Sequence, residues 1–363
     1  MMGWYYAKEL AKTAEVKLAG PEFAGAKSDF ALRPGAPLQP VLDRLGSWPD
    51  FYVEFYSKPG YHPADLPALK IPKAWYIYDT HLHLDELCTA SYLFDLVFCP
   101  SEADRQRLLA RGVPRVEVLE FAADPDMYFR PIEETRPKKL CLGFAGSARG
   151  HAQLKGREEF LRRVAERYPL HIEHRTLQGG PVADFYRDCD IVLNHAIGGE
   201  LNMRVPEALM SGSALLTPEV EGLTDFIDTQ RSLAIFNGDN VFEKIETLLA
   251  RPDLRLELAR HGQQEVLAKH TYAHRAQKLV ACLEEHRRQG FPSKNPWLLE
   301  AAQLRYTMFR HPGSGVEMLS RPVLLPPGLA GRGLGLFTRL WAKKLRALAK
   351  LMGKKSLFED LAE

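Results

Sequence analysis

Glu207 stands in the first turn of a short predicted helix, a position from which a carboxylate can bind a ligand. Pro206 suits the first turn of that helix, Gly212 suits the residue just past its end, and residues 214–217 predict a buried strand. A carboxylate that faces a cleft can accept two hydrogen bonds from a vicinal diol such as that of a ribose. Glu207 is therefore a candidate nucleotide ligand. The alternative is that it only complements the dipole of its own helix.

A glycine-rich and cationic loop follows the predicted strand 140–145. The side chains and backbone amides that could bind an anion there belong to Gly146, Ser147, Arg149, Lys155 and Arg157. Phosphate oxygens need fixed N–H donors and cations, because their charge is costly to desolvate. The spacing matches neither GxxxxGK[ST] nor GxGxxG, so the loop is not a P-loop or a dinucleotide fingerprint. A diphosphate contact is the functional interpretation, and solvated surface cations are the alternative.

A second loop precedes the helix that carries Glu207. It contains Gly198 and Gly199, which let the backbone approach a ligand closely, and then the polar residues Glu200, Asn202 and Arg204. With the loop at Gly146 it would form the two walls of a nucleotide-diphosphate pocket. An ordinary flexible turn is the alternative.

The segment Asp79-Thr80-His81-Leu82-His83 follows a predicted strand and allows two kinds of chemistry. An aspartate and an HxH pair at a strand end resemble the first metal-binding strand of amidohydrolase-type barrels, where two imidazoles bind zinc. That motif belongs on the first strand of a barrel, whereas two predicted strands precede it here. In a cleft enzyme, Asp79 or His81 would instead be the catalytic group, as general base or as a contact to the transferred group.

The predicted elements alternate between strands and helices in both halves of the chain. The first half has predicted strands at 16–18, 51–55, 73–78, 95–99 and 116–119, with helices at 4–14 and 102–110. The second half has predicted strands at 140–145, 170–173, 190–194, 214–217 and 232–236, with helices at 156–168, 182–187, 241–249, 254–267 and 272–286. This pattern predicts an α/β fold of two Rossmann-like, doubly wound domains that face a cleft. Ligands bind beyond the carboxyl ends of such strands.

We expect an N-terminal domain at 1–130, a second domain at 138–288 and a helical extension at 289–363. The polar, proline-containing stretch between the first two suits a linker. The chain opens almost at once on a helix, so the first strand of the N-terminal domain is expected to be missing or supplied otherwise.

Composition places the chain among soluble globular proteins, with 45% hydrophobic and 26% charged residues. Its five cysteines never show CxxC spacing, which argues against a disulfide framework or a structural zinc site. The net charge of +2 conceals a tail, residues 332–355, that holds eight basic residues and no acidic one. The remainder is acidic, so we expect no nucleic-acid partner. We expect a cytoplasmic protein whose basic amphipathic tail contacts the inner membrane face; a helix lying on the protein's own surface is the alternative.

The second half resembles the C-terminal domain of GT-B glycosyltransferases of the group-1 branch related to spore-maturation (CgeB-like) enzymes. The resemblance is carried by Asn202-x-Arg204-Val205-x-Glu207-Ala208-Leu209-x-x-Gly212, then by Leu215-Leu216-Thr217 and Glu221-Gly222-Leu223, and by His270-Thr271-Tyr272-x-His274-Arg275. In the first half, 71–79, 94–98 and 122–125 are similar to the same group. Coverage is about residues 50–288.

The resemblance implies a metal-independent, hexosyltransferase-like enzyme of glycan biosynthesis without a cofactor. Its donor would be a UDP-, GDP- or dTDP-sugar, and its acceptor a glycan, a protein or a lipid-linked molecule presented by the N-terminal domain. Glu207 matches the ribose-binding glutamate, and Arg149, Lys155 and Arg157 match the cations that steady the diphosphate. Many retaining relatives carry two glutamates eight positions apart, whereas Glu200 lies seven before Glu207; retention is still expected over inversion. A GT-B protein that binds nucleotide without turnover is the alternative.

Overall fold

Two separate parallel sheets organise the chain in the computed structural model. The structure describes residues 2–20, 27–55, 62–133, 137–147, 155–174 and 179–290. These belong to one compact unit, Met1–Lys294, and the second unit, Asn295–Glu363, lies outside the described residues. The expected helical extension and basic tail therefore fall outside them as well.

The first sheet has four parallel strands in the order β3-β4-β5-β6. They are β3 (Tyr52–Glu54), β4 (Lys73–Tyr76), β5 (Leu96–Cys99) and β6 (Val116–Val118). Every residue of β4 and β5 is buried, as the near-continuous apolar runs of central parallel strands require. Before β3, the described chain has no strand of more than two residues. It holds the helices α1 (Met2–Leu10) and α2 (Gln39–Leu42) and the paired two-residue strands β1 (Ala19–Gly20) and β2 (Phe30–Ala31).

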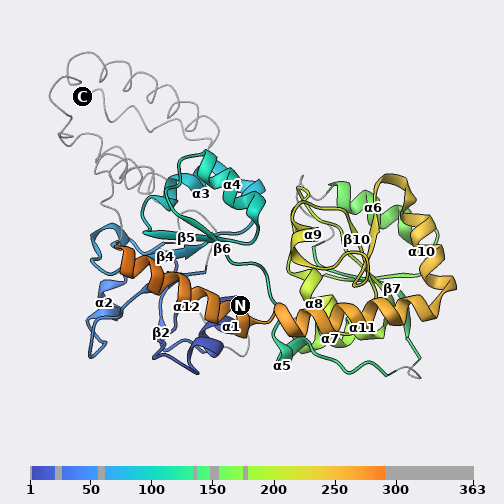
Figure 1. The fold of residues 1–363 in the computed structure, drawn as a ribbon, viewed down its shortest axis with the longest axis horizontal. Helices are drawn as coiled ribbons and strands as arrows, with labels where there is room; N and C mark the ends of the chain where they lie inside the picture. The colour runs from blue at the N-terminus through green and yellow to red at the C-terminus, as the bar shows by residue number, and fades with distance from the viewer. Residues whose placement is uncertain are drawn as a thin grey trace, which may run out of the picture. The chain divides into compact units, whose positions relative to one another are not determined.

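Helices cover both faces of this sheet (Figure 1). On one face lie α3 (Thr80–Ser91) and α4 (Glu102–Ala110), the latter capped by the Ser101 side chain. On the other, α1 packs against α12 (Tyr272–Gln289), a helix that comes from the far end of the described chain. Tyr5 stacks on Tyr272 with ring centroids 4.8 Å apart, and Tyr6 stacks on Phe55 at 4.4 Å. The last described helix thus completes the core of the first sheet.

The second sheet has five parallel strands in the order β11-β10-β9-β7-β8. They are β7 (Leu140–Ala145), β8 (Leu170–Glu173), β9 (Cys189–Leu193), β10 (Leu215–Pro218) and β11 (Ala234–Phe236). Side chains alternate between the faces: Ile191 and Leu193 pack under one layer of helices and Val192 under the other.

The helices of the second half lie on both faces of its sheet (Figure 1). One layer holds α6 (Lys155–Ala165) and α10 (Val241–Ala250). The other holds α7 (Gly180–Asp188), α8 (Arg204–Met210) and α11 (Pro252–Lys269), while the single turns α5 (Pro125–Tyr128) and α9 (Leu223–Phe226) fill connections. The short 3-10 turns η1 (Leu66–Ala68) and η3 (Gly238–Asn240) complete the described elements.

Two chain segments join the halves, and Arg275 ties them together. One follows β6 and the other is the junction of α11 with α12; the Ala123 N–H donates to the His270 carbonyl at 3.0 Å. Arg275, only 5% exposed, donates to the carbonyls of Glu120, Phe121 and Lys269 at 3.0, 3.4 and 3.1 Å. The two segments that connect the halves are therefore hydrogen-bonded to each other, and we call this region the joint.

The predicted α/β fold of two doubly wound halves is confirmed. The strands and helices of the second half lie within a few residues of their predicted bounds, because each carries a clear apolar pattern. The sequence did not predict α3, since its first turn was interpreted as a motif at a strand end.

Candidate functional site

We use the word crevice for the region beyond the carboxyl ends of β7 and β9, where ligands of doubly wound sheets bind. These strands are neighbours, while their connections run to opposite sides through β8 and β10, so their carboxyl ends form a topological switch point. Gly146 directly follows β7 with φ of +147°, and a side chain there would collide with the Arg204 guanidinium. The positive φ is what favours glycine here, and any added side chain would also displace the end of the Arg204 side chain.

Arg204 is fixed in the crevice by three kinds of contact. Its Nε donates to the Ala145 carbonyl at 2.8 Å, its Nη1 donates to Asn194 Oδ1 at 2.5 Å, and its guanidinium lies over the Phe144 ring at 4.4 Å. Asn194 is fully buried at the end of β9 and also accepts a hydrogen bond from Asn202 Nδ2 at 3.1 Å. A partly exposed guanidinium held in this way can meet an anion without reorganising.

Glu207 lies three residues after Arg204 on α8, about one helical turn further along. Burial raises the pKa of its carboxyl to about 7, and the hydroxyl of Tyr128 and the charge of Arg204 oppose that rise. The residue as a whole is partly exposed. An acceptor of this kind suits a pair of neighbouring hydroxyls.

Arg157 joins the two strand-end loops. Its Nε and Nη2 donate to the His195 carbonyl at 3.1 and 2.6 Å, and its Nη1 donates to the Ser147 carbonyl at 3.0 Å. The side chain is 7% exposed. Arg157 therefore shapes the crevice by holding its walls. Arg149 and the side chain of Lys155 lie outside the described residues.

Glu200, on the loop after β9, is bound by the first half of the chain. Its carboxylate accepts from Arg107 at 3.3 Å, and it lies 2.9 Å from Thr80 Oγ1 and 2.7 Å from His81 Nδ1. This hydrogen bond raises the pKa of His81. Asp79, exposed and with φ of +56°, precedes the helix that carries these groups.

The same cluster continues beneath Thr80. Asp104, 2% exposed, accepts from Thr80 Oγ1 at 2.5 Å and from Ser101 Oγ at 2.6 Å. Arg107 bridges Asp104 to both Glu200 and Glu221. These contacts set His81 beside the loop that carries Glu200, and so bring one proposed catalytic residue next to a proposed donor residue.

The metal interpretation finds no matching geometry. His81 and His83 belong to α3 and not to a strand end, and the side chain of His83 lies outside the described part. Across the described ranges, no group of three or more His, Cys, Asp or Glu side chains is arranged to hold a metal ion.

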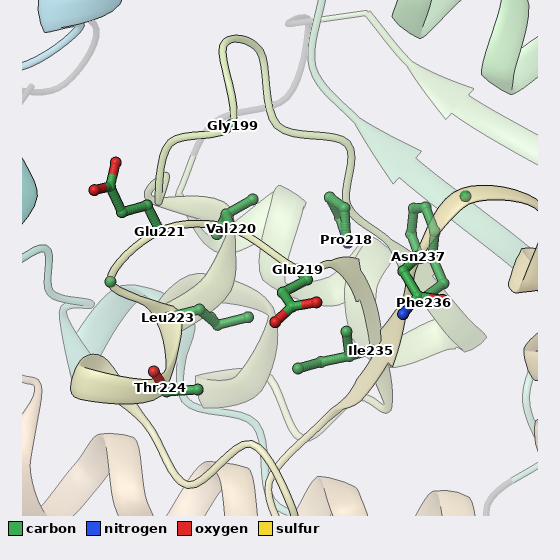
Figure 2. A pocket seen from close by; sticks show the side chains of 12 residues that line it. Gly199, Pro218, Glu219, Val220, Glu221, Leu223, Thr224, Ile235, Phe236 and Asn237 are labelled. Carbon is green, nitrogen blue, oxygen red and sulfur yellow. The ribbon is translucent and has the colours of Figure 1, made fainter.

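A pocket of about 610 Å³ opens beyond β10 and β11 (Figure 2). It borders Gly199 and is lined further by the segments after both strands. Its lining residues are Gly199, Pro218, Glu219, Val220, Glu221, Gly222, Leu223, Thr224, Ile235, Phe236, Asn237 and Gly238.

Several residues of this region were not predicted. Asn194 carried a signal, because it is a polar residue at the end of an apolar strand. No sequence signal pointed to Tyr128 or Arg107. Arg107 looks like any residue on the surface of a predicted helix, and Tyr128 stands in a segment without a functional pattern. The pocket residues lie at or after the ends of predicted strands. Residues 221–223 belong to the pattern shared with GT-B glycosyltransferases, whereas no pattern of residue types marks Glu219, Thr224 or Asn237.

Among the described residues, no helix is both long enough and apolar enough to cross a membrane. That finding concerns only the ranges given above.

Comparison with known proteins supplies the context for this geometry. A family model described as glycosyl transferase-like matches residues 145–281. The solved structure of sucrose-phosphate synthase from Thermosynechococcus elongatus is 10% identical, with 70% of this chain and 77% of that chain covered and a TM-score of 0.53. HepE from Anabaena, in complex with UDP-glucose, is 12% identical, with 60% and 73% covered and a TM-score of 0.48.

A glycosyltransferase from Rickettsia africae is 13% identical, with 66% and 78% covered and a TM-score of 0.49. The search among curated proteins gave no match. The likeness in structure extends over both sheets, whereas the likeness in sequence is confined to the half with the crevice. The chain therefore has the GT-B fold, and its residues 145–281 match the glycosyl transferase-like family.

Proposed function

We propose that this protein transfers a sugar from a nucleotide-diphosphate sugar to an acceptor hydroxyl. The observation that carries the proposal is that Arg204 is held, partly exposed, at the carboxyl ends of β7 and β9 in the family-matched half, with Glu207 one turn further along the same helix. The solved HepE structure contains UDP-glucose, which supports a donor of that class. The closer resemblance to the spore-maturation branch remains a prediction.

The donor would bind with its diphosphate at Arg204 and the backbone of Gly146 and Ser147, and with its ribose at Glu207. Guanidinium and backbone N–H groups can neutralise the leaving diphosphate, so the reaction needs no metal in this proposal. Asn202 would orient the crevice through Asn194, and Arg157 would hold the loop walls. Arg149 and Lys155 remain proposed diphosphate ligands.

In the transfer step the bond between the anomeric carbon and the diphosphate oxygen breaks, and a bond to the acceptor oxygen forms. The acceptor proton passes to the diphosphate, which suits retention of configuration because no separate base is needed. His81, with its raised pKa, is charged over a wider pH range and so suits hydrogen-bond donation better than proton removal. We propose that His81 contacts the transferred group or acceptor, with Asp79 beside it and Glu200 orienting it.

A thermal-shift panel of UDP, GDP, dTDP and CMP tests nucleotide binding. A nucleotide at 100 times its dissociation constant should add about 2.7 kcal/mol to the free energy of unfolding. Glu207→Gln should weaken binding about tenfold, since it loses one charged acceptor of the ribose diol. Glu243→Gln, an exposed carboxylate on α10, is the matched control.

The absence of any shift with all four nucleotides would contradict the proposal, and unchanged affinity in Glu207→Gln would remove that residue from the site. Nucleotide binding without donor hydrolysis or transfer would instead favour a GT-B scaffold protein.

We also propose a cytoplasmic enzyme whose tail, 332–355, contacts an anionic membrane surface. The support is its eight basic residues without an acidic one. Deleting residues 332–363 should reduce sedimentation with anionic liposomes, and unchanged sedimentation would contradict the membrane contact.

A further inference from the structure

The pocket beyond β10 and β11 has no assigned ligand, and of its lining residues only Glu221 takes part in the ion-pair cluster described above. It lies on the same edge of the sheet as the crevice, because the carboxyl ends of parallel strands share one edge. The strand order sets the separation: β10 and β11 stand beside β9 on the side away from β7. With strands about 4.8 Å apart, the pocket centre is about 10 Å from the crevice.

That separation suits a nucleotide-diphosphate sugar whose diphosphate lies in the crevice and whose sugar, attached to the diphosphate, reaches the pocket. The loop between them begins after β9 and passes Gly199, which borders the pocket. Gly199 has φ of +73°, and a side chain added there would meet no atom within 4 Å. The rim beside the crevice is therefore open.

The pocket combines an apolar floor with a few hydrogen-bonding groups. Leu223 and Phe236 are buried, whereas Glu219, Thr224 and Asn237 are exposed at its wall. Figure 2 shows the Glu219 side chain among the lining residues. A pyranose ring has the same mixed character, with C–H faces and hydroxyl edges, and a carboxylate can accept from two neighbouring hydroxyls.

The charge of the pocket is negative. No lysine or arginine stands among its lining residues. Glu221 is paired with Arg107, and its carboxylate lies at the outer edge in Figure 2. Glu219 makes no side-chain hydrogen bond or ion pair with the residues that the structure describes, and only its backbone N–H is bonded, to the Phe236 carbonyl. Its carboxylate would repel a second carboxylate in the same small space.

We propose that this pocket holds the transferred sugar of the donor, and that Glu219 selects a neutral or amino sugar against a uronic acid. The inference rests on the proposed function, and it adds the place and the chemical class of the sugar. Glu219 acts as a specificity-determining residue that touches the sugar hydroxyls.

Calorimetric titration of UDP, UDP-glucose and UDP-glucuronate separates the sugar from the nucleotide; GDP, GDP-mannose and GDP-mannuronate are titrated in parallel. The wild-type chain should bind the neutral sugar nucleotide at least about tenfold more tightly than the uronate. The Glu219 carboxylate would accept hydrogen bonds from the hydroxyls of the neutral sugar, and it would repel the carboxylate of the uronate. Glu219→Gln should lower that preference several-fold and leave the affinity for the bare diphosphate unchanged. Thr224→Trp, which narrows the pocket, should weaken both sugar nucleotides but not the diphosphate.

Glu243→Gln again serves as the control, because it removes an exposed carboxylate from α10, outside the pocket. Equal losses of diphosphate and sugar nucleotide in Glu219→Gln would overturn the inference, as would wild-type binding of the uronate equal to that of the neutral sugar. A wild-type chain that binds neither diphosphate would count against the proposed function itself, so the two failures are distinguishable.

Discussion

Arg275 at the joint and Arg204 in the crevice are both held by backbone carbonyls, but they differ in what they leave available. Arg275 donates to three carbonyls, lies 2.7 Å from His270 Nδ1, and is 5% exposed. Arg204 donates to one carbonyl and one amide oxygen, lies on Phe144, and keeps partial exposure. The first is almost fully buried, whereas the second keeps partial exposure at the carboxyl ends of β7 and β9.

The ionisable neighbours of the two arginines differ in the same sense. At the joint, Arg275 lowers the pKa of Glu120, and burial with the charge of Arg275 lowers the pKa of His270 to about 4. His270 is thus a neutral ring whose Nδ1 accepts from Arg275, while its buried Nε2 has no hydrogen-bond partner among the described residues. Near Arg204, burial raises the pKa of the Glu207 carboxyl to about 7, while the Tyr128 hydroxyl and the charge of Arg204 oppose that rise. Burial thus dominates the protonation of a carboxyl beside Arg204, whereas the charge of Arg275 lowers the pKa of the carboxyl beside it.

The largest effect should come from Arg275→Met. It keeps an apolar stem but leaves three carbonyls at the joint without their donor, so the free energy of unfolding should fall by about 3 kcal/mol. Urea unfolding measures the change. Arg287→Met, on an exposed arginine of the same helix, should cost well under 1 kcal/mol. A loss that small for Arg275→Met would show that the joint does not depend on the guanidinium.

The joint also shows what the sequence predicts and what it leaves out. The pattern His270-Thr271-Tyr272-x-His274-Arg275 pointed only to a family. In the structure Thr271 caps α12 with His274 in a capping box, Tyr272 stacks on Tyr5, and Arg275 holds the crossings. A helix start can be inferred from residue types three apart. The return of α12 to the first sheet cannot, because it depends on aromatic packing between residues far apart in the chain.

In the candidate site, too, some residues were predicted from local pattern, and some contacts were not. Arg204, Asn202 and Gly146 were predicted because loops after predicted strands converge at one edge of a parallel sheet. The contact of Glu200 with Thr80 and His81 was not predicted, since it joins segments about 120 positions apart. Local pattern thus predicts which residues lie in the strand-end loops, but the partners of each residue depend on packing.

Arg204→Lys should have a smaller effect on stability and a larger one on binding. The lysine keeps the charge, but it cannot donate to Ala145 and Asn194 together or stack flat on Phe144, so about 1 kcal/mol of stability should be lost. Affinity for the nucleotide diphosphate should fall about tenfold, because the diphosphate loses a fixed two-pronged donor. Urea unfolding and calorimetric titration measure the two quantities on the same preparation.

Arg255→Lys gives a matched control for this variant. Arg255 is also partly buried and fork-bonded, to Asp190 and to the carbonyls of Leu248 and Leu249, but it lies at the amino end of β9. Its replacement should cost similar stability and leave nucleotide affinity unchanged. Arg204→Lys could instead lower the free energy of unfolding as much as Arg275→Met and leave nucleotide affinity unchanged. In that case Arg204 would have a structural role like that of Arg275 and no role in binding. A selective loss of affinity would show that the difference between the two arginines lies in the unfilled side of the crevice.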